Sequence, residues 1–380
     1  MNRLKVAIDT ESYDLGYKEC LAGVAEFLKC NNSTDVVLYL LEENLEIAKG
    51  LFGSNSRVML ISSPKSAKAS VPASEVLRDI IETNKLDLEK RKFAFTMSQS
   101  IYDTITGKAD VAVLAGHSGH AAGIARAIER NLDTLNPDIP ICLGVNLPNA
   151  HGIPRMIMDM GAIVNQDLFK LAVLAEYYMQ YGVGVKCPKV GFLNIGTEET
   201  KGGPEIREAS KRYRELYPKN SYGEYGFIEP NNLIGRNECN AVICDAFHGN
   251  LAIKSMEGTY TFVINAVTEY LNSSILKQAL YIPVGHAFKS IFAKYNPDLF
   301  LPAILFGFSK LITKVHGNCK AKSLVCALKN IPAYKLSFDK FQDHLKSDTK
   351  FSQIINHNAS QSDSEHSLEM NTENHQDSNG

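Results

Sequence analysis

The stretch VGFLNIGTEETKGG, residues 190–203, is the most informative part of the chain for the fold. It opens with four apolar or small residues that predict a short buried strand, and it ends in a glycine pair. An amphipathic helix is predicted next, because apolar side chains recur on one helical face at Ile206, Ala209, Tyr213 and Leu216. The stretch therefore predicts a strand, a loop and a helix in succession.

The same order of strand and helix repeats on both sides of this stretch. Short apolar runs that precede polar or helix-like segments lie at residues 6–8, 36–41, 58–61, 111–114, 156–158, 190–193 and 242–244. Such runs, alternating with amphipathic helices, are typical of strands buried on both faces of a sheet. The sequence predicts an α/β fold with a mainly parallel sheet flanked by helices, and ligand binding at the carboxyl ends of its strands.

Two segments depart from this alternation. Residues 259–300 contain two helix-like runs, Tyr260–Leu280 and Ala287–Phe292, without a strand between them, which predicts a helical hairpin outside the sheet. Residues 347–380 are rich in Ser, Asn, Gln, His and Asp, which predicts a disordered acidic tail. We therefore expect one elaborated α/β domain over residues 1–340, followed by the tail.

The charge is nearly balanced, with 40 Lys and Arg against 42 Asp and Glu. Five acidic residues and no Lys or Arg lie in residues 361–380, so residues 1–360 carry about +3. This balance argues against a general nucleic-acid binder, which would have a basic domain. The eight cysteines form no C-x-x-C pair or ordinary zinc spacing, so reduced thiols and no metal site are expected.

The chain has no apolar segment that predicts membrane insertion. Near the N-terminus, the apolar run at residues 6–8 is only three residues long before the charged Asp9. This run is too short to be the apolar core of a signal peptide. The longest uncharged apolar stretch, Leu299–Ser309, is far shorter than the roughly 20 residues that span a bilayer. A cytoplasmic protein without a transmembrane segment is expected.

Three loops contain residues suited to anion binding. The first, Asn194–Gly203, combines Gly196 and Gly202, which allow close backbone approach, with the hydroxyl of Thr197 and the cation of Lys201. It lacks the G-x-x-x-x-G-K-[ST] order of a Walker A loop. An ordinary connection between strand and helix remains the alternative interpretation.

The second loop follows the strand at residues 242–244. Asp245 ends that strand, Gly249 and Asn250 are predicted to form a turn, and Lys254 is placed about one helical turn later. Asp245 could orient a ligand or a lysine, or it could simply be a helix N-cap, for which aspartate is a preferred residue.

The third loop, AGHSGHAAG at residues 115–123, offers Gly116, His117, Ser118 and Gly119 for an anion-binding turn. A serine hydrolase is a weaker alternative, because G-H-S-G is one residue short of G-x-S-x-G. His117 and His120 could share a metal, but no third ligand is placed.

Together these segments carry a resemblance to a known family. VGFLNIGTEETKG, FIEPNNL and VICDAFHGNLAIKSMEG, within residues 190–258, resemble the phosphate acyltransferase family of bacterial phospholipid synthesis. Asp9–Asp14 resembles its D-A-M-G-G-D, residues 115–119 its A-G-N-T-G, residues 158–162 its L-D-x-G-A, and residues 315–317 its S-H-G. Several loop positions depart from the family, including Ser12 and Tyr13 in place of its glycine pair, and Ile139 in place of an arginine. The chain is identified as a diverged member.

The resemblance implies a phosphotransacylase/isopropylmalate-dehydrogenase-like fold and formation of acyl-phosphate from acyl-(acyl-carrier-protein) and inorganic phosphate, without a cofactor. It places the phosphate on the loops, and we assign catalytic roles to four residues and substrate binding to nine. The catalytic set is Lys201, Asp245, Asn194 and Asn250; the binding set is Gly196, Thr197, Gly202, Gly116, His117, Ser118, Gly119, Asp9 and Lys254.

The resemblance also implies partners. Acyl carrier protein is acidic, so its docking face should be basic, and two candidate faces are Arg207, Lys211, Arg212 and Arg214, or Lys310, Lys314, Lys320 and Lys322. A membrane-bound glycerol-3-phosphate acyltransferase would take the product. The hairpin would serve a homodimer or peripheral contact with the inner face of the membrane. A short-chain phosphotransacylase that uses acyl-coenzyme A and a degenerate paralogue that acts as a scaffold remain alternatives.

Overall fold

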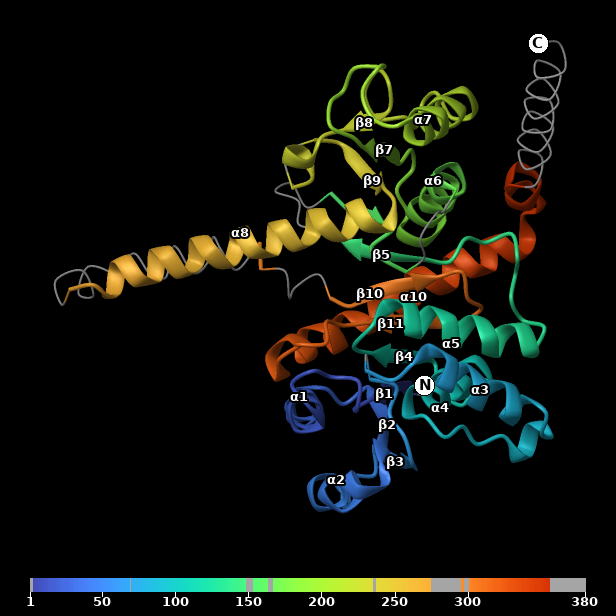
Figure 1. The fold of residues 1–380 in the computed structure, drawn as a ribbon, viewed down its shortest axis with the longest axis vertical. Helices are drawn as coiled ribbons and strands as arrows, with labels where there is room; N and C mark the ends of the chain where they lie inside the picture. The colour runs from blue at the N-terminus through green and yellow to red at the C-terminus, as the bar shows by residue number, and fades with distance from the viewer. Residues whose placement is uncertain are drawn as a thin grey trace, which may run out of the picture.

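The computed structural model describes residues 3–68, 70–147, 153–162, 167–234, 237–274, 295–296 and 301–355. All eleven strands named within these ranges join one sheet, in the order β3-β2-β1-β4-β11-β10-β5-β6-β9-β7-β8 (Figure 1). Its first parallel block consists of β1 (Leu4–Asp9), β2 (Thr34–Leu41), β3 (Val58–Ser63), β4 (Val111–Leu114) and β11 (Leu311–Lys314).

A second parallel block forms the other half of the sheet. It consists of β6 (Met156–Met158), β9 (Cys239–Ile243), β7 (Lys189–Leu193) and β8 (Phe227–Ile228). The two blocks are joined through β10 (Ala303–Phe306) and β5 (Cys142–Asn146), and the pairs β11–β10, β10–β5 and β5–β6 are antiparallel. The mainly parallel α/β fold is confirmed, and so are the seven strands predicted from apolar runs.

Helices cover both faces of the sheet. The described helices are α1 (Tyr17–Cys30), α2 (Leu45–Phe52), α3 (Ala73–Asn84), α4 (Thr96–Ile105), α5 (Ser118–Asn131), α6 (Leu168–Tyr177), α7 (Pro204–Leu216), α8 (Ala246–Asn272) and α10 (Ala321–Ser347). A π-helical turn, Tyr178–Val183, continues α6, and short 3₁₀ turns lie at Glu42–Asn44, Leu88–Lys90 and Pro230–Asn232.

The central strands explain why both faces are covered. In β4, Val111 and Val113 pack into the core that includes α1, α2, α6, α7 and α10, whereas Ala112 and Leu114 pack into the core that includes α3, α4, α5 and the first turns of α8. Alternate side chains of a strand point to opposite faces, so a continuous apolar strand requires a layer of helices on each side.

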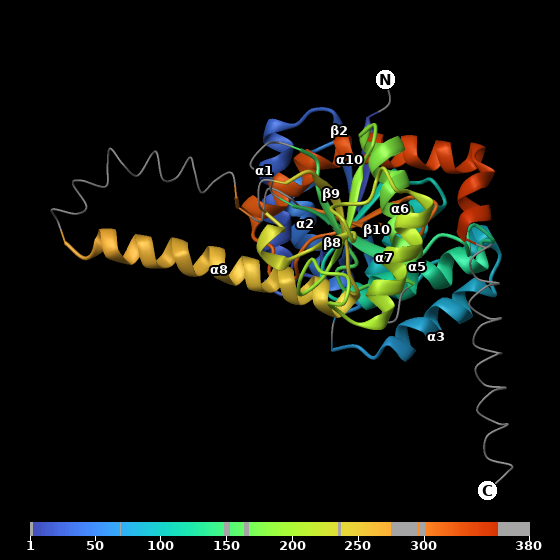
Figure 2. The ribbon, with the colours of Figure 1, turned by 90° about the horizontal axis from the view of Figure 1, so that it is seen from above.

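The predicted helical hairpin is only partly described. Its first arm is α8, which begins at Ala246 rather than near Tyr260 and continues without a break to Asn272. Figures 1 and 2 show α8 starting near the middle of the molecule and extending far beyond the helices that flank the sheet. The second predicted arm, Ala287–Phe292, lies outside the described residues.

The packed part of the chain extends further than the predicted boundary at residue 340. α10 runs to Ser347, and residues 349–355 are again helical, with Phe351 and Ile355 buried in the core. The prediction of a disordered segment beginning at residue 347 is therefore wrong for residues 347–355. The segment is mostly polar, which predicts disorder, but these two apolar side chains are enough to anchor it to the core. The rest of the predicted tail lies outside the described residues.

Candidate active site

One large cavity lies between the two parallel blocks of the sheet, with a volume of about 1280 Å³. Its walls come from the loops that follow β4, β7, β9 and β11, together with the first five turns of α8. Ligand pockets in proteins are usually about 300–1,000 Å³, so this cavity is large enough for a long or composite ligand.

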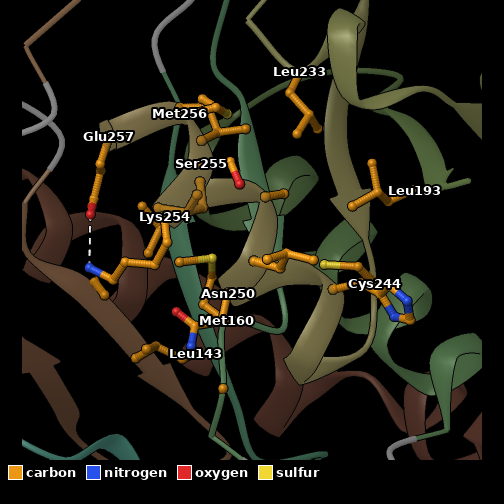
Figure 3. A pocket seen from close by; sticks show the side chains of 18 of the residues that line it. Leu143, Met160, Leu193, Leu233, Cys244, Asn250, Lys254, Ser255, Met256 and Glu257 are labelled. Atoms are coloured by element: carbon orange, nitrogen blue, oxygen red, sulfur yellow. Dashed lines mark hydrogen bonds and ion pairs between the residues drawn. The ribbon is translucent and has the colours of Figure 1, made fainter. Parts of the chain in front are cut away.

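Most of the cavity wall is apolar. Figure 3 shows Leu143, Met160, Leu193, Leu233 and Met256 around the cavity, with Lys254 and Glu257 on its polar side. The apolar side chains come from β5, from the loop after β6, from the end of β7, from the segment before β9 and from α8. A wall of this kind favours a hydrocarbon group, because each methylene that leaves water contributes about 0.8 kcal/mol.

The position of α8 decides which side chains reach the cavity. Asp245 caps the helix by accepting the backbone N–H groups of Phe247 and His248, both at 2.9 Å. Gly249 packs so closely on the carbonyl of Asp159 that a Cβ there would overlap the carbonyl oxygen. The predicted turn at Gly249 and Asn250 is therefore wrong: both residues are helical, and Lys254 lies more than two turns into α8.

A cluster of charged side chains occupies the polar end of the cavity. Glu257 accepts from Lys254 Nζ at 2.8 Å and from His316 Nε2 at 3.0 Å, and Lys254 Nζ lies 3.5 Å from His316 Nδ1. Burial alone would raise the pKa of Glu257, but these two partners outweigh it and lower that pKa to about 2. We call Lys254, Glu257, Lys314 and His316 the cation cluster, because three of its four members are basic.

Lys314 is the most buried cation of this cluster. It is the last residue of β11 and lines the cavity. Its Nζ donates only to the carbonyl of Val315 at 3.4 Å, and no salt bridge joins it to a carboxylate within the described residues. Burial, and then repulsion by Lys254, lower the pKa of Lys314 to about 8, despite the opposing influence of Asp14 and Glu257. A largely desolvated cation that forms no salt bridge favours the binding of an anionic ligand.

The start of α5 lies on the same cavity. Gly116, His117 and Ser118 line it, and Gly116 has φ 78°, a conformation that favours glycine. Ser118 is the first residue of α5, whose 14 residues direct their free N–H groups and positive dipole toward this end. Gly119, which was predicted to belong to the same turn, does not line the cavity.

The loop from Asn194 to Gly203 is held largely by bonds within itself. Asn194 Nδ2 donates to the carbonyl of Lys201 at 2.9 Å, and its Oδ1 accepts from the N–H of Ile195 at 2.9 Å. Gly202 has φ 83°, and a Cβ there would overlap the Asn194 side chain. Asn194 and Gly202 line the cavity, whereas the exposed Lys201 does not. Asn194 therefore shapes the loop.

The predicted site residues divide into two groups. Eight of them line the cavity: Asn194, Gly202, Asp245, Asn250, Lys254, Gly116, His117 and Ser118. Lys201, Gly196, Thr197, Gly119 and Asp9 are not among the lining residues. Asp9 is completely buried at the end of β1, where desolvation raises its pKa to about 6.

Sequence reasoning did not assign His248, Glu257, His316 or Lys314 to the site. His248 lines the cavity, and its Nδ1 is hydrogen-bonded to Asp245 Oδ2. Lys314 was grouped with a surface-exposed docking face, and its position facing the cavity corrects that prediction for this residue. An Asp at a helix N-cap with His three residues later was the available signal for His248.

The α/β fold places an apolar wall and a basic cluster in one cavity at the carboxyl ends of its strands. The chain belongs to the family described as "Fatty acid synthesis protein", whose model matches residues 4–333. It is 26% identical over 327 residues to a phosphate acyltransferase of Cellvibrio japonicus (86% of this chain, 92% of the relative). It is 28% identical over 328 residues to a phosphate acyltransferase of Thermosipho melanesiensis (86% and 91%).

The fold is also similar to that of a solved structure. The chain superposes on a phosphotransacetylase from Streptococcus pyogenes with a TM-score of 0.50, covering 90% of this chain and 94% of the other at 12% identity. At that identity the likeness shows the fold alone. No helix in the described part of the chain combines the length and apolar character that crossing a membrane requires.

Proposed function

We propose that this protein is a phosphate acyltransferase, which forms acyl-phosphate from acyl-(acyl-carrier-protein) and inorganic phosphate for phospholipid synthesis. Membership in the family and relatives named phosphate acyltransferase support this proposal. The observation that carries it is the joining of two environments in one cavity. An apolar wall suited to an acyl chain continues into the cation cluster, which is suited to phosphate.

Phosphate would bind between the cation cluster and the start of α5. Bound phosphate would stabilise the charged form of Lys314, which forms no salt bridge in the described residues. Lys254 and His316 are held in place by their ion pairs with Glu257. The backbone at Ser118 adds the N–H groups and dipole of a helix N-terminus. This proposal replaces Lys201 with Lys314 as the principal phosphate-binding lysine, because Lys201 does not line the cavity.

The chemistry needs alignment more than it needs activation. Phosphate dianion is already a nucleophile, so the protein has to hold it beside the thioester carbonyl and stabilise the oxyanion that develops. The amide of Asn250 lies on the cavity side of α8 (Figure 3) and is proposed to donate to that oxygen. Asn194 supports the opposite wall by fixing the loop, and no covalent acyl-enzyme is required.

The partners follow from the substrates. Acyl carrier protein is proposed to dock on the basic face of α7, where Lys211 and Arg207 are exposed, while Arg212 lies 4.4 Å from the ring of Phe169. The outer half of α8 exposes Phe262 and Tyr270, and we propose it as the surface for a homodimer or for peripheral membrane contact. This protein is proposed to be cytoplasmic and to pass the acyl-phosphate to a membrane-bound glycerol-3-phosphate acyltransferase.

One assay tests the proposed function against its alternatives. The purified full chain is incubated with a long-chain acyl-carrier thioester or with short-chain acyl-coenzyme A, with and without inorganic phosphate, and acyl-phosphate is trapped with hydroxylamine. Phosphate-dependent product from the carrier thioester is expected. Product from acyl-coenzyme A alone would favour the short-chain phosphotransacylase, and no product from either donor would favour a scaffold.

A further inference from the structure

Asp245 and His248 form a hydrogen-bonded pair at the start of α8. Asp245 Oδ1 accepts two backbone N–H groups at 2.9 Å, and Oδ2 is hydrogen-bonded to His248 Nδ1. Desolvation would raise the pKa of Asp245, but the backbone and ring hydrogen bonds from His248 outweigh it and lower that pKa. The aspartate is therefore an ionised acceptor whose orientation is fixed by the helix that it caps.

This arrangement selects one tautomer of the histidine. An ionised carboxylate accepts hydrogen bonds only, so Nδ1 of His248 must carry the proton that it shares with Asp245. Whenever the ring is neutral, Nε2 therefore presents a lone pair, and no hydrogen bond to Nε2 occurs within the described residues. Both residues line the cavity, so a base oriented by a carboxylate faces the place where a substrate would bind.

We propose that His248, oriented by Asp245, carries a proton from phosphate to the leaving thiol during acyl transfer, an inference that rests on the proposed function. An oxygen of HPO₄²⁻ forms a bond to the thioester carbonyl carbon, and the carbon–sulfur bond breaks. The phosphate proton moves to Nε2 of His248, and the imidazolium passes it to the departing thiolate. Acyl-phosphate dianion and a free thiol result, and His248 returns to its neutral state, so charge and protons balance.

His248 lies on the same helix as Lys254 of the cation cluster. His248 and Lys254 are six residues apart, which is about 9 Å along a helix axis. Both side chains line the same cavity. Asp245 would stabilise the imidazolium that forms transiently, as the carboxylate of a catalytic triad does for its histidine.

The test compares the parent with His248→Gln and Asp245→Asn in the full chain. Because His248 is exposed, glutamine should not change the melting temperature, whereas the rate with an alkyl thioester should fall about 100-fold, within the range for general acid–base catalysis. An acyl thioester of an acidic aryl thiol needs no proton on its leaving group. With that donor, the loss in His248→Gln should shrink to about 10-fold or less.

Two readouts separate a proton carrier from a structural residue. In the parent, the pH–rate profile should have an acidic limb that is absent in His248→Gln, and Asp245→Asn should lower kcat more than it raises the KM for phosphate. A parent that makes acyl-phosphate while His248→Gln keeps full activity with the alkyl thioester would overturn the inference alone. Equal losses with alkyl and aryl thioesters would also overturn it. A parent that makes no acyl-phosphate would overturn the proposed function and the inference together.

Discussion

Replacing Lys314 with methionine should separate stability from phosphate binding. The substitution keeps most of the side chain's length but removes a charge that forms no salt bridge within the described residues. The pKa of Lys314 is lowered from 10.5 to about 8, and each pKa unit corresponds to about 1.4 kcal/mol. Keeping the lysine charged at neutral pH therefore costs about 3 kcal/mol, which partial exposure reduces to about 2 kcal/mol.

The sign of the pH effect follows from the lowered pKa. Between about pH 8 and 10.5 the unfolded chain holds the Lys314 proton and the folded chain does not, so the free energy of unfolding rises with pH across that window. Below pH 8 the full cost of the charge is present. Lys314→Met should remove the cost at neutral pH, raising the free energy of unfolding by about 2 kcal/mol, and should flatten this part of the pH dependence.

Phosphate binding should change in the opposite direction. A hydrogen bond to a charged group contributes about 1.5–3 kcal/mol, so the KM for phosphate should rise by about 10- to 100-fold in Lys314→Met. In the parent, that KM should rise above pH 8 as Lys314 loses its proton. Initial rates at varied phosphate, together with denaturant unfolding at pH 7, measure both quantities.

A matched control is Lys340→Met, which removes an exposed lysine of α10 that does not line the cavity. It should leave both the KM for phosphate and the free energy of unfolding nearly unchanged. If Lys314→Met lowers stability and leaves the KM for phosphate unaltered, the placement of phosphate at the cation cluster is refuted.

Lys201→Ala should change the KM for phosphate by less than about 3-fold, since Lys201 does not line the cavity, and a loss above 10-fold would restore its predicted catalytic role. Met256→Trp should fill part of the cavity and shift the preferred acyl donor to shorter chains, with about a 4-fold loss in kcat/KM for each methylene excluded. An unchanged preference across a series of donors of different chain length would contradict this prediction. Burial raises the pKa of Glu176 to about 7, so the free energy of unfolding should fall by up to about 3 kcal/mol from pH 4.5 to 7. Denaturant unfolding measures this dependence, and Glu176→Leu should lack it.

Local sequence patterns predicted the strands and helices whose burial shows in a run of neighbouring residues. The apolar runs at β1, β2, β3, β4, β6, β7 and β9 identify strands because both faces of the sheet are covered, and α7 shows an amphipathic face. β5, β8, β10 and β11 were not predicted. β11 pairs with β4, about 200 residues earlier in the chain, and no local window contains that pairing.

The boundaries of α8 were mispredicted for a different reason. Gly249 was interpreted as part of a turn, but its missing side chain allows the helix to approach the carbonyl of Asp159. A glycine in a sequence window does not distinguish a turn from such a close contact. The continuous helix then carries Lys254 and Glu257 to the far end of the cavity, where His316 meets them.

The candidate site was predicted in outline and not in its details. The three loops were identified from their composition, and Asn194, Asp245 and Ser118 do line one cavity. Lys201 has the same local surroundings expected of a ligand-binding lysine, whereas Lys314 ends a four-residue strand, and only the assembled sheet shows which of them faces the cavity. Burial is a tertiary property, so the choice between the two lysines needed the structure.

In the proposed reaction, inorganic phosphate itself attacks the acyl thioester. The most direct measurement supplies long-chain acyl-(acyl-carrier-protein) and phosphate labelled with a heavy oxygen isotope, and analyses the products by mass spectrometry. The expected product is acyl-phosphate that retains every labelled oxygen, including the one that bridges carbon and phosphorus. Unlabelled free fatty acid as the enzymatic product, formed at the same rate without phosphate, would contradict it.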